Sequence, residues 1–373
     1  MIPFSRPAIT DREQAYIANA LAGKLCGDGP YTKEASLLFQ KATGVAGMIL
    51  TTSCTHALEL AALLCDIGPG DEVILPSYTF SSTANAFLLR GAKLVFCDIR
   101  PDTLNMDEKL IPGLISSKTK VVVPVHYAGV ACEMDAIRSI SDKHGLFVVE
   151  DAAQAVGSTY KSRPCGEWGN VGCYSFHETK NYCMGEGGGV VIRDGEMRNR
   201  AEMIREKGTD RGSFLRGEVD KYTWRQIGSS FLPSDILAAM LCAQLTRFDE
   251  IMQSRMHVWN AYHNAFGPLE EKGWRRPVVP GDCTHNAHMY YLLAPSFHAR
   301  ADFITRLKER GVQSVSHYEP LHASPMGLSL GYEPEDLPLT LDLAARLVRL
   351  PMWAGMSGDQ VTTVISAVLA AVI

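Results

Sequence analysis

Short apolar runs alternate with amphipathic segments along the first 150 residues, and this alternation restricts the fold more than any other feature of the sequence. The apolar runs lie at 48–51, 72–75, 94–97, 120–125 and 146–149. The segments between them predict helices at 55–65, 81–89, 107–116 and 133–144. Strands that are apolar at every position are buried on both faces, which is typical of parallel sheets covered by helices. The sequence therefore predicts an α/β fold with a mainly parallel sheet and helices on both faces.

The segments outside this alternation predict further helices and a second domain. Helices are expected at 11–22, 33–44, 194–207, 299–310, 341–349 and 358–372, with a strand at 288–293. A single long helical pattern runs from Ser234 to about Phe266, and Pro277, Pro280 and Gly281 mark a break after it. A chain of 373 residues is long enough for two domains. We expect a large domain over 1–245 and a smaller C-terminal α+β domain over 246–373.

Charge and apolar patterning argue against two classes of partner. The net charge of −5 gives no basic surface, so nucleic acid is not expected as a partner. The longest apolar runs are far shorter than the roughly 20 residues that span a bilayer, and the first residues do not resemble a secretory signal. The sequence is therefore expected to be that of a cytoplasmic protein without a membrane partner.

The ten cysteines form no CxxC pair, which favours reduced thiols over disulfides or a zinc site, and no metal site is expected. Cys173 and Cys183 flank a turn that carries Lys180, so a cysteine nucleophile is one interpretation of them. Packing as small apolar side chains is the favoured one, because their spacing implies no catalytic base.

Lys180 lies on a turn between two short strand-like segments, 172–176 and 190–192. A lysine on a turn is usually a solvated surface charge. The alternative is an amine that forms a Schiff base with an aldehyde cofactor. The glycines at 185–189 lead into a strand rather than a helix, so they are not a dinucleotide-binding fingerprint, and close approach of the backbone explains them better.

Residues that follow the apolar runs would meet at one edge of a parallel sheet, where ligands bind in such folds. Asp151 follows a buried strand and is either a loop or N-cap residue or the partner of a protonated pyridine nitrogen. Thr55 begins a helix, where phosphate binds well. Phe80 is either a core ring or a ring on the face of a cofactor. Together with Lys180, these residues match the needs of pyridoxal 5'-phosphate.

Several blocks of the chain resemble the sugar aminotransferases of the DegT/DnrJ/EryC1/StrS family, which are pyridoxal-phosphate-dependent enzymes of fold type I. The blocks that carry the resemblance lie at 52–58, 76–86, 124–129, 150–155 and 175–181. Within this family, the loop 24–29 and Trp224 with 227–230 are similar to the subgroup of dTDP-4-oxo-6-deoxyglucose 4-aminotransferases.

The resemblance implies a role for each matching residue. Lys180 matches the Schiff-base lysine and Asp151 the pyridine partner. The other matching positions are Gln154 and Phe80 beside the cofactor ring, Cys54, Thr55 and Ser175 at its phosphate, and His317 and Tyr318 near the sugar nucleotide. The resemblance also implies a homodimer in which each subunit completes the other's active site. Many members carry a Gly-x-Asn-x-Arg run for that contact, whereas this chain has serine and leucine in 228–232, so Ser230 takes the place of the asparagine.

The function implied is transfer of an amino group from L-glutamate to the 4-keto carbon of a dTDP-linked 4-keto-6-deoxyhexose. A 3-keto sugar aminotransferase and a non-catalytic regulator with the same fold are alternatives. A sugar dehydratase is disfavoured, because in that subfamily a histidine takes the lysine position, and here it is Lys180.

Overall fold

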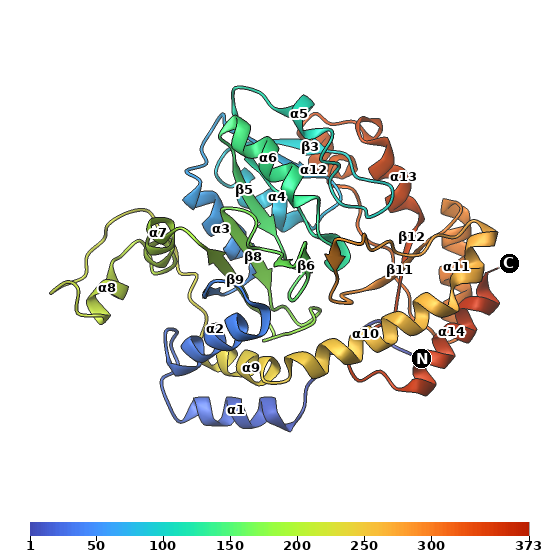
Figure 1. The fold of residues 1–373 in the computed structure, drawn as a ribbon, viewed down its shortest axis with the longest axis horizontal. Coiled ribbons are helices and arrows are strands. Elements are labelled where there is room, and N and C mark those ends of the chain that lie inside the picture. The colour runs from blue at the N-terminus through green and yellow to red at the C-terminus, as the bar shows by residue number, and fades with distance from the viewer. Residues whose placement is uncertain (373) are drawn as a thin grey trace.

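The centre of the molecule is a seven-stranded sheet (Figure 1). The computed structural model describes residues 1–372. From one edge of the sheet to the other, the strands are β1 (Met48–Thr51), β9 (Gly188–Ile192), β8 (Val171–Ser175), β5 (Phe147–Asp151), β4 (Thr119–Val122), β2 (Glu72–Pro76) and β3 (Lys93–Cys97). Each of the five apolar runs of the N-terminal half forms one of these strands, although the run predicted over 120–125 already ends at Val122.

The sheet is parallel except at β9. The pairs β2/β3, β2/β4, β4/β5 and β5/β8 are parallel, whereas β9 is antiparallel to both of its neighbours, β8 and β1. β8 and β9 are joined by the segment 176–187, which contains no helix that could cross over the sheet, and the chain returns beside β8 in the opposite direction. This segment carries Lys180. The prediction of a mainly parallel sheet is confirmed.

Helices cover both faces of the sheet, as predicted. Neighbouring residues of β5 show the division, since Val148 and Val149 are both fully buried but belong to opposite cores. On the face of Val148 lie α2 (Pro30–Thr43), α6 (Met134–His144) and α9 (Asp235–Leu245). On the face of Val149 lie α3 (Cys54–Leu64), α4 (Ser81–Leu88) and α7 (Gly195–Arg205).

The single helix expected over 234–266 is wrong, because the structure has two helices there. The first, α9, ends at Leu245, and α10 runs over Phe248–Ala265. Arg247 between them has φ −113° and ψ 24°, which is outside the helical region. In Figure 1 α10 extends from the sheet domain to the C-terminal part of the chain.

A third core gathers residues of α10 with elements of the C-terminal part. These elements are β11 (Tyr290–Leu293), α11 (Phe297–Glu309), β12 (Leu347–Leu350) and α14 (Gly358–Ala371). The helix α13 (Pro338–Arg346) instead contributes Leu343 and Ala344 to a fourth core with Tyr78 and Tyr127. The helix expected over 341–349 is wrong at its end, because 347–350 form β12, which pairs antiparallel with β11. The first residues of the chain also lie here, since Ile2 bridges to Val312. The division of the chain at 245/246 stays a prediction.

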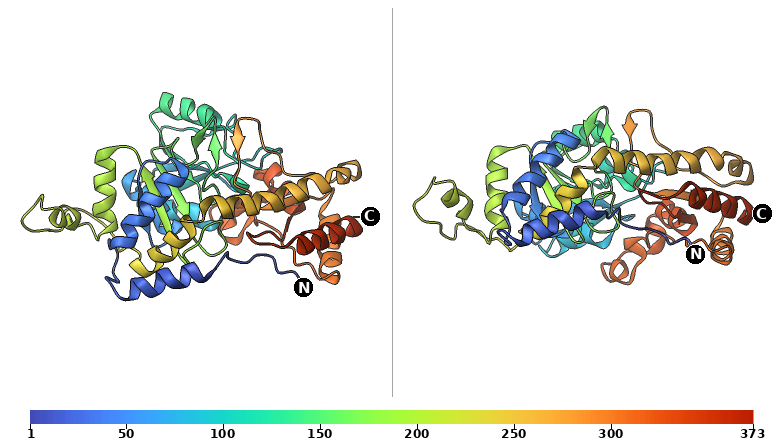
Figure 2. Two further views of the ribbon diagram at one scale, coloured as in Figure 1. Left: turned by 60° about the horizontal axis from the view of Figure 1, so that its bottom comes forward. Right: turned by 90° about the horizontal axis from the view of Figure 1, so that it is seen from below.

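The remaining elements are short, apart from α1 (Asp11–Leu21). They are α5 (Ile111–Leu114), β6 (Thr159–Tyr160), β7 (Arg163–Pro164), α8 (Arg211–Leu215), β10 (Cys283–Thr284) and α12 (Pro325–Ser329), with four 3₁₀ turns at 127–129, 267–272, 321–323 and 334–336. The helix expected over 107–116 is therefore only the single turn α5. The segment around α8 projects away from the body of the molecule in both views of Figure 2. No helix within 1–372 combines the length and the apolar character needed to cross a membrane.

Candidate active site

A cavity of about 570 Å³ opens at the carboxyl ends of the parallel strands, between the sheet and the C-terminal part. The structure brings nine of the ten predicted site residues to its walls: Cys54, Thr55, Phe80, Asp151, Gln154, Ser175, Lys180, His317 and Tyr318. Ser230 is exposed and lies outside this cavity. Its predicted contact with the partner subunit's cofactor stays a prediction.

Lys180 is held on the β8–β9 turn, where its backbone N–H donates to the carbonyl of His177 over 2.9 Å. Its side chain lines the cavity rather than the outer surface. Burial lowers the pKa of the ammonium, and the positive charge of Arg349 lowers it further, while the negative charge of Asp151 acts in the opposite direction. Lys180 is thus not a solvated surface charge, and its lowered pKa makes the free amine more available for nucleophilic or base chemistry.

Asp151 ends β5 and has 6% of its surface exposed. One carboxylate oxygen accepts a hydrogen bond of 2.7 Å from the hydroxyl of Thr83, and the other accepts one of 3.1 Å from the backbone N–H of Ala153. The hydroxyl of Thr83 also lies 2.8 Å from that of Thr79. No helix begins at Asp151, so the N-cap interpretation is wrong. The hydrogen bonds fix a carboxylate at the cavity wall, where it would pair with a protonated ring nitrogen.

The N-terminus of α3 forms another wall. Ser53 caps this helix, because its hydroxyl accepts from the N–H of His56 over 3.1 Å. The N–H groups of the first helical turn have no partner within the helix, and the side chains of Cys54 and Thr55 line the cavity beside Ser175. Backbone donors and hydroxyls at a helix N-terminus would hold the phosphate of the cofactor.

A glycine on β9 allows this wall to form. A Cβ atom on Gly188 would lie 2.4 Å from the backbone nitrogen of Cys54 and 2.4 Å from the carbonyl carbon of Ser53. Backbone atoms of α3 cannot yield as a flexible side chain would. Gly188 therefore permits the close approach of β9 to the start of α3, as predicted for the glycines at 185–189.

The two aromatic residues that follow β2, Tyr78 and Phe80, lie in different environments. Tyr78 is 1% exposed and packs in a core with Tyr127. Phe80 is 59% exposed although it lines the cavity, so its ring is available to a ligand. The core alternative is thus wrong for Phe80, and stacking on a cofactor ring explains an exposed phenylalanine inside a cavity.

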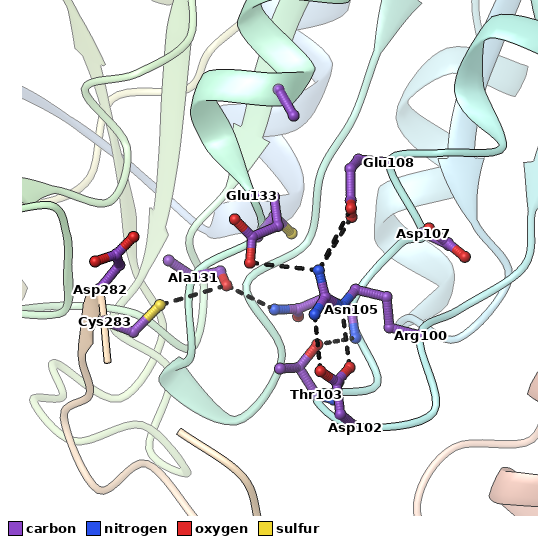
Figure 3. A network of polar contacts seen from close by, with 12 residues as sticks. Arg100, Asp102, Thr103, Asn105, Asp107, Glu108, Ala131, Glu133, Asp282 and Cys283 are labelled. Atoms are coloured by element: carbon purple, nitrogen blue, oxygen red, sulfur yellow. Dashed lines mark hydrogen bonds and ion pairs between the residues drawn. The ribbon is translucent and has the colours of Figure 1, made fainter. Parts of the chain in front are cut away.

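Gln154 connects the sheet with the C-terminal part. Its side-chain oxygen accepts from the N–H of Ala128 over 2.7 Å, and its side-chain nitrogen donates to the hydroxyl of Tyr318 over 3.1 Å. Ala128 has φ 57°, so its turn needs support. Asn105 provides it, because its side chain accepts from Tyr127 N–H and donates to the carbonyl of Ala131, as Figure 3 shows for Ala131.

His317 lies beside the aromatic side chains of Tyr127 and Tyr318. Its Nδ1 lies 3.0 Å from the hydroxyl of Tyr127. Burial lowers the pKa of His317 well below its ordinary value, and Arg349 and Lys180 add to this effect. The imidazole is therefore neutral at pH 7 and offers a hydrogen bond rather than a charge.

Three arginines that were not predicted from the sequence also line the cavity: Arg6, Arg255 and Arg349. Arg255 is buried, its guanidinium donates to the carbonyls of Ala287 and His288, and burial lowers its pKa to about 10. Arg349 of β12 lines the cavity too. A signal was present for Arg349, because it is the one charged residue in the apolar run 347–353.

Cysteine and metal chemistry find no support in the described part of the chain. All ten cysteines are free. Burial raises the pKa of Cys173 well above its ordinary value and that of Cys183 to about 11, so both are neutral thiols and packing is their role. Residues 1–372 contain no group of three or more His, Cys, Asp or Glu side chains placed to hold a metal ion.

The chain is similar to several known proteins over nearly its whole length. It is 35% identical to the spore coat polysaccharide biosynthesis protein SpsC of Bacillus subtilis, over 98% of this chain and 96% of SpsC. It superposes on the aminotransferase TlmJ of Streptoalloteichus hindustanus with a TM-score of 0.91 and 32% identity, covering 100% of this chain and 98% of TlmJ. Spr1654 of Streptococcus pneumoniae, a candidate sugar aminotransferase solved in its pyridoxal-phosphate form, gives 0.91 and 27%, with 99% and 98% covered.

The match to a family profile covers almost the whole chain and not only the residues at the cavity. The profile of the DegT/DnrJ/EryC1/StrS aminotransferase family matches residues 7–369, which includes all ten predicted site residues. The lysine, the carboxylate and the helix N-terminus at the cavity fit pyridoxal phosphate. The chain belongs to the DegT/DnrJ/EryC1/StrS aminotransferase family, and its fold is that of the pyridoxal-phosphate-dependent enzymes of fold type I.

Proposed function

We propose that this aminotransferase moves an amino group from L-glutamate to the 4-keto carbon of a dTDP-linked 4-keto-6-deoxyhexose, giving a 4-amino-4,6-dideoxy sugar. The observation that carries the proposal is the placement of Lys180 and Asp151 on the walls of one cavity whose other walls suit a phosphate. The similarity to a polysaccharide biosynthesis protein supports a sugar as the acceptor. The 4-keto position rests on the resemblance of 24–29 and 227–230 to one subgroup.

Each residue of the cavity has a separate task in this proposal. Lys180 would hold the cofactor covalently, and Asp151 would keep its ring nitrogen protonated. Cys54, Thr55 and Ser175 would bind its phosphate, while Phe80 and Gln154 would fix the ring between them. Bound pyridoxal phosphate would supply an aldehyde that accepts the amino group and a ring that withdraws electrons.

The acid–base steps fall to Lys180. Once the donor has displaced it, its Nζ takes the proton from the α-carbon of the donor amino acid and later delivers a proton to the sugar carbon that receives the amine. The lowered pKa of Lys180 favours the free amine that the first transfer needs. His317 and Tyr318 would hold the hydroxyl groups of the sugar, since both are neutral hydrogen-bonding side chains at the cavity wall.

The first experiment tests the cofactor assignment. The purified protein should show a near-visible absorption band that borohydride abolishes, and Lys180→Ala should lack the band and lose more than ~10³-fold in turnover. Circular dichroism of the variant confirms that it is folded. A folded Lys180→Ala protein with normal turnover would overturn the assignment, and a wild-type protein that never binds the cofactor would indicate a regulator.

The second experiment identifies the substrates. The protein is incubated with dTDP-4-keto-6-deoxyglucose and L-glutamate, and NMR of the product shows which carbon carries nitrogen. A 4-amino sugar is expected. An amine at C3 from the corresponding 3-keto isomer would establish the alternative enzyme, and a panel of other amino acids shows whether glutamate is the donor.

We also propose that the enzyme is a homodimer with shared active sites. Large apolar side chains on the projecting segment around α8 are exposed: Phe214, Leu215, Tyr222, Trp224 and Ile227. Apolar surface on a segment that leaves the body of the molecule favours burial against another protein surface. Ser230 follows this segment and is exposed, as a residue that reaches the partner's phosphate must be.

A further inference from the structure

The turn that precedes β11 is held in a strained conformation at the wall of the cavity. Ala287 has φ 48°, in the left-handed region that a residue with a side chain rarely adopts. The side-chain nitrogen of Asn286 donates to two carbonyls of the segment 154–156. The guanidinium of Arg255 donates to the carbonyls of Ala287 and His288. Strain of this kind persists only where the surroundings enforce it, and it is typical of functional sites. The polar side chain that follows the strained residue is His288, which lines the cavity.

Hydrogen bonds fix the tautomer of His288. The side-chain nitrogen of Asn181 donates to the carbonyl of Asn286 over 2.8 Å, which leaves the side-chain oxygen of Asn181 for His288. That oxygen lies 2.9 Å from Nδ1 of His288 and carries no hydrogen, so Nδ1 is the donor. In a neutral imidazole the other nitrogen, Nε2, is then an acceptor with a free lone pair.

The imidazole of His288 is neutral at pH 7. The residue is 5% exposed, and burial lowers the pKa of the imidazole well below its ordinary value. The positive charges of Lys180, Arg255 and Arg349 lower this pKa further, as does that of His317. His288 can therefore accept a hydrogen bond from an ammonium group without taking its proton.

Nε2 of His288 has no partner within the chain. No donor among residues 1–372 forms a hydrogen bond with it, and, unlike Oδ1 of Asn286, it is not enclosed by other atoms. Among the surrounding charges, that of Lys180 has the largest effect on the pKa of His288, as expected of a near neighbour. Lys180 also directly precedes Asn181 in the chain. The residue that orients the ring therefore also anchors the turn from which the lysine extends.

We propose that His288 is a positioning residue for Lys180, whose Nζ donates a hydrogen bond to Nε2 of His288 whenever the lysine is not bound to the cofactor. Asn181 acts through His288, because it fixes the tautomer of the ring. This inference rests on the proposed function, in which the freed Lys180 transfers protons. A free lysine side chain samples many rotamers, and an acceptor beside its amine restricts them to those from which a proton can be transferred.

The test separates the two nitrogens of the ring. His288→Asn places an amide near Nδ1, which keeps the hydrogen bond to Asn181 and removes Nε2, whereas His288→Gln places an amide near Nε2. His285→Asn is the matched control, because His285 lies in the same turn but outside the cavity, and asparagine keeps an acceptor for the N–H of Ala287. Each variant is assayed for turnover when it is loaded with cofactor. The cofactor-free form of each is assayed for the pH dependence of pyridoxal phosphate uptake, which reports the pKa of Lys180.

In His288→Asn, kcat should fall roughly ten- to hundredfold, while the KM values for glutamate and for the nucleotide sugar should change by less than about threefold. The pKa of Lys180 should fall, because the ammonium loses an acceptor that stabilises it. His288→Gln should restore part of kcat, because its amide oxygen can accept in place of Nε2. His285→Asn should match the wild type in both measurements.

A pKa of Lys180 equal to that of the wild type in a folded His288→Asn protein would overturn the inference. A loss that appears only as a raised KM for the nucleotide sugar would overturn it too, and would assign Nε2 to a sugar hydroxyl. An equal loss in His285→Asn would show that only the shape of the turn matters.

If His288→Asn does not fold, Asn181→Asp decides. Its carboxylate still accepts from Nδ1, but the negative charge should raise the pKa of His288, so that Nε2 becomes protonated and turnover is lost at acidic pH. An acidic limb of the pH profile identical to that of the wild type would equally overturn the inference. A wild-type protein that takes up no pyridoxal phosphate would refute the proposed function itself, so the two failures are distinguishable.

Discussion

At the scale of single residues, opposing charges control the protonation of Lys180. Burial and Arg349 lower its pKa below the ordinary 10.5, and Asp151 acts against them. We predict that, in the cofactor-free protein, Asp151→Asn lowers the pKa of Lys180 further and that Arg349→Met raises it. The pH dependence of the rate of pyridoxal phosphate uptake measures this pKa, because only the free amine attacks the aldehyde. Shifts of the opposite sign would show that other groups dominate.

The same pKa predicts how the stability of the cofactor-free protein depends on pH. A lysine whose pKa is lower in the folded than in the unfolded protein binds fewer protons when folded, so it destabilises the fold at pH values below its folded pKa. Replacing it with methionine should therefore stabilise the cofactor-free protein at pH 7, and the difference from wild type should shrink as the pH rises toward 10.5. Urea denaturation at several pH values measures it. A difference that does not vary with pH would contradict the assignment.

Thr83 acts on Asp151 from behind the cavity wall. Its hydroxyl donates to the carboxylate over 2.7 Å and is completely buried. We predict that Thr83→Val, which keeps the shape, costs about 1–2 kcal/mol of stability and weakens retention of the cofactor. Thr83→Ser keeps the hydroxyl and is the control. Dialysis followed by absorbance measures retention, and equal retention in Thr83→Val and wild type would show that Thr83 does not position the carboxylate.

At the scale of elements, the site depends on how closely β9 approaches α3. A Cβ on Gly188 would lie 2.4 Å from backbone atoms of Ser53 and Cys54. We predict that Gly188→Ala displaces the start of α3 and weakens pyridoxal phosphate binding by more than about tenfold, as fluorescence titration would show. Gly195→Ala at the start of α7 is the control, because nothing lies within 4 Å of its Cβ position. Equal affinity of the two variants for pyridoxal phosphate would mean that β9 can move without displacing Cys54 and Thr55 at the start of α3.

The elements also show where sequence patterns reach their limit. The apolar runs predicted β1 to β5 because buried parallel strands carry an unmistakable pattern. The break between α9 and α10 has no glycine or proline at Thr246 and Arg247, so nothing local predicts it. Likewise, 347–350 continue the apolar pattern of α13, and only pairing with β11 makes them a strand. That pairing depends on residues that are distant in sequence.

The candidate site shows the same limit. Asp151 ends β5, and Lys180 and Phe80 follow β8 and β2, so the edge of a parallel sheet brings them together predictably. Arg255 and Arg349 reach the cavity from α10 and from β12. Their arrival depends on how the C-terminal part packs on the sheet domain, and a pattern within one segment carries no information about that.

At the scale of the whole molecule, the projecting segment around α8 should decide the oligomeric state. Trp224 is 75% exposed and Ile227 is 65% exposed. We predict that the double variant Trp224→Ser/Ile227→Ser shifts the protein from dimer to monomer and lowers turnover at least tenfold, because each site would lose its partner's residues. Analytical ultracentrifugation measures the state. A fully active variant that remains dimeric would place the interface elsewhere. Leu37→Ser is the control, because Leu37 is an exposed apolar residue of α2, outside the projecting segment, and its loss should leave the protein dimeric.

The long-range pairs of the sheet set the order in which the chain can assemble during synthesis. β1 lies at an edge, and its sole neighbour in the sheet is β9 at 188–192. The start of α2 is capped by Asp235, which accepts from the N–H groups of Tyr31 and Thr32. The first strand and the second helix therefore leave the ribosome long before their partners exist. About half of the chain must be made before β1 can join the sheet. Because these pairs join segments that are distant in sequence, refolding of the complete chain should also be slow and sensitive to protein concentration.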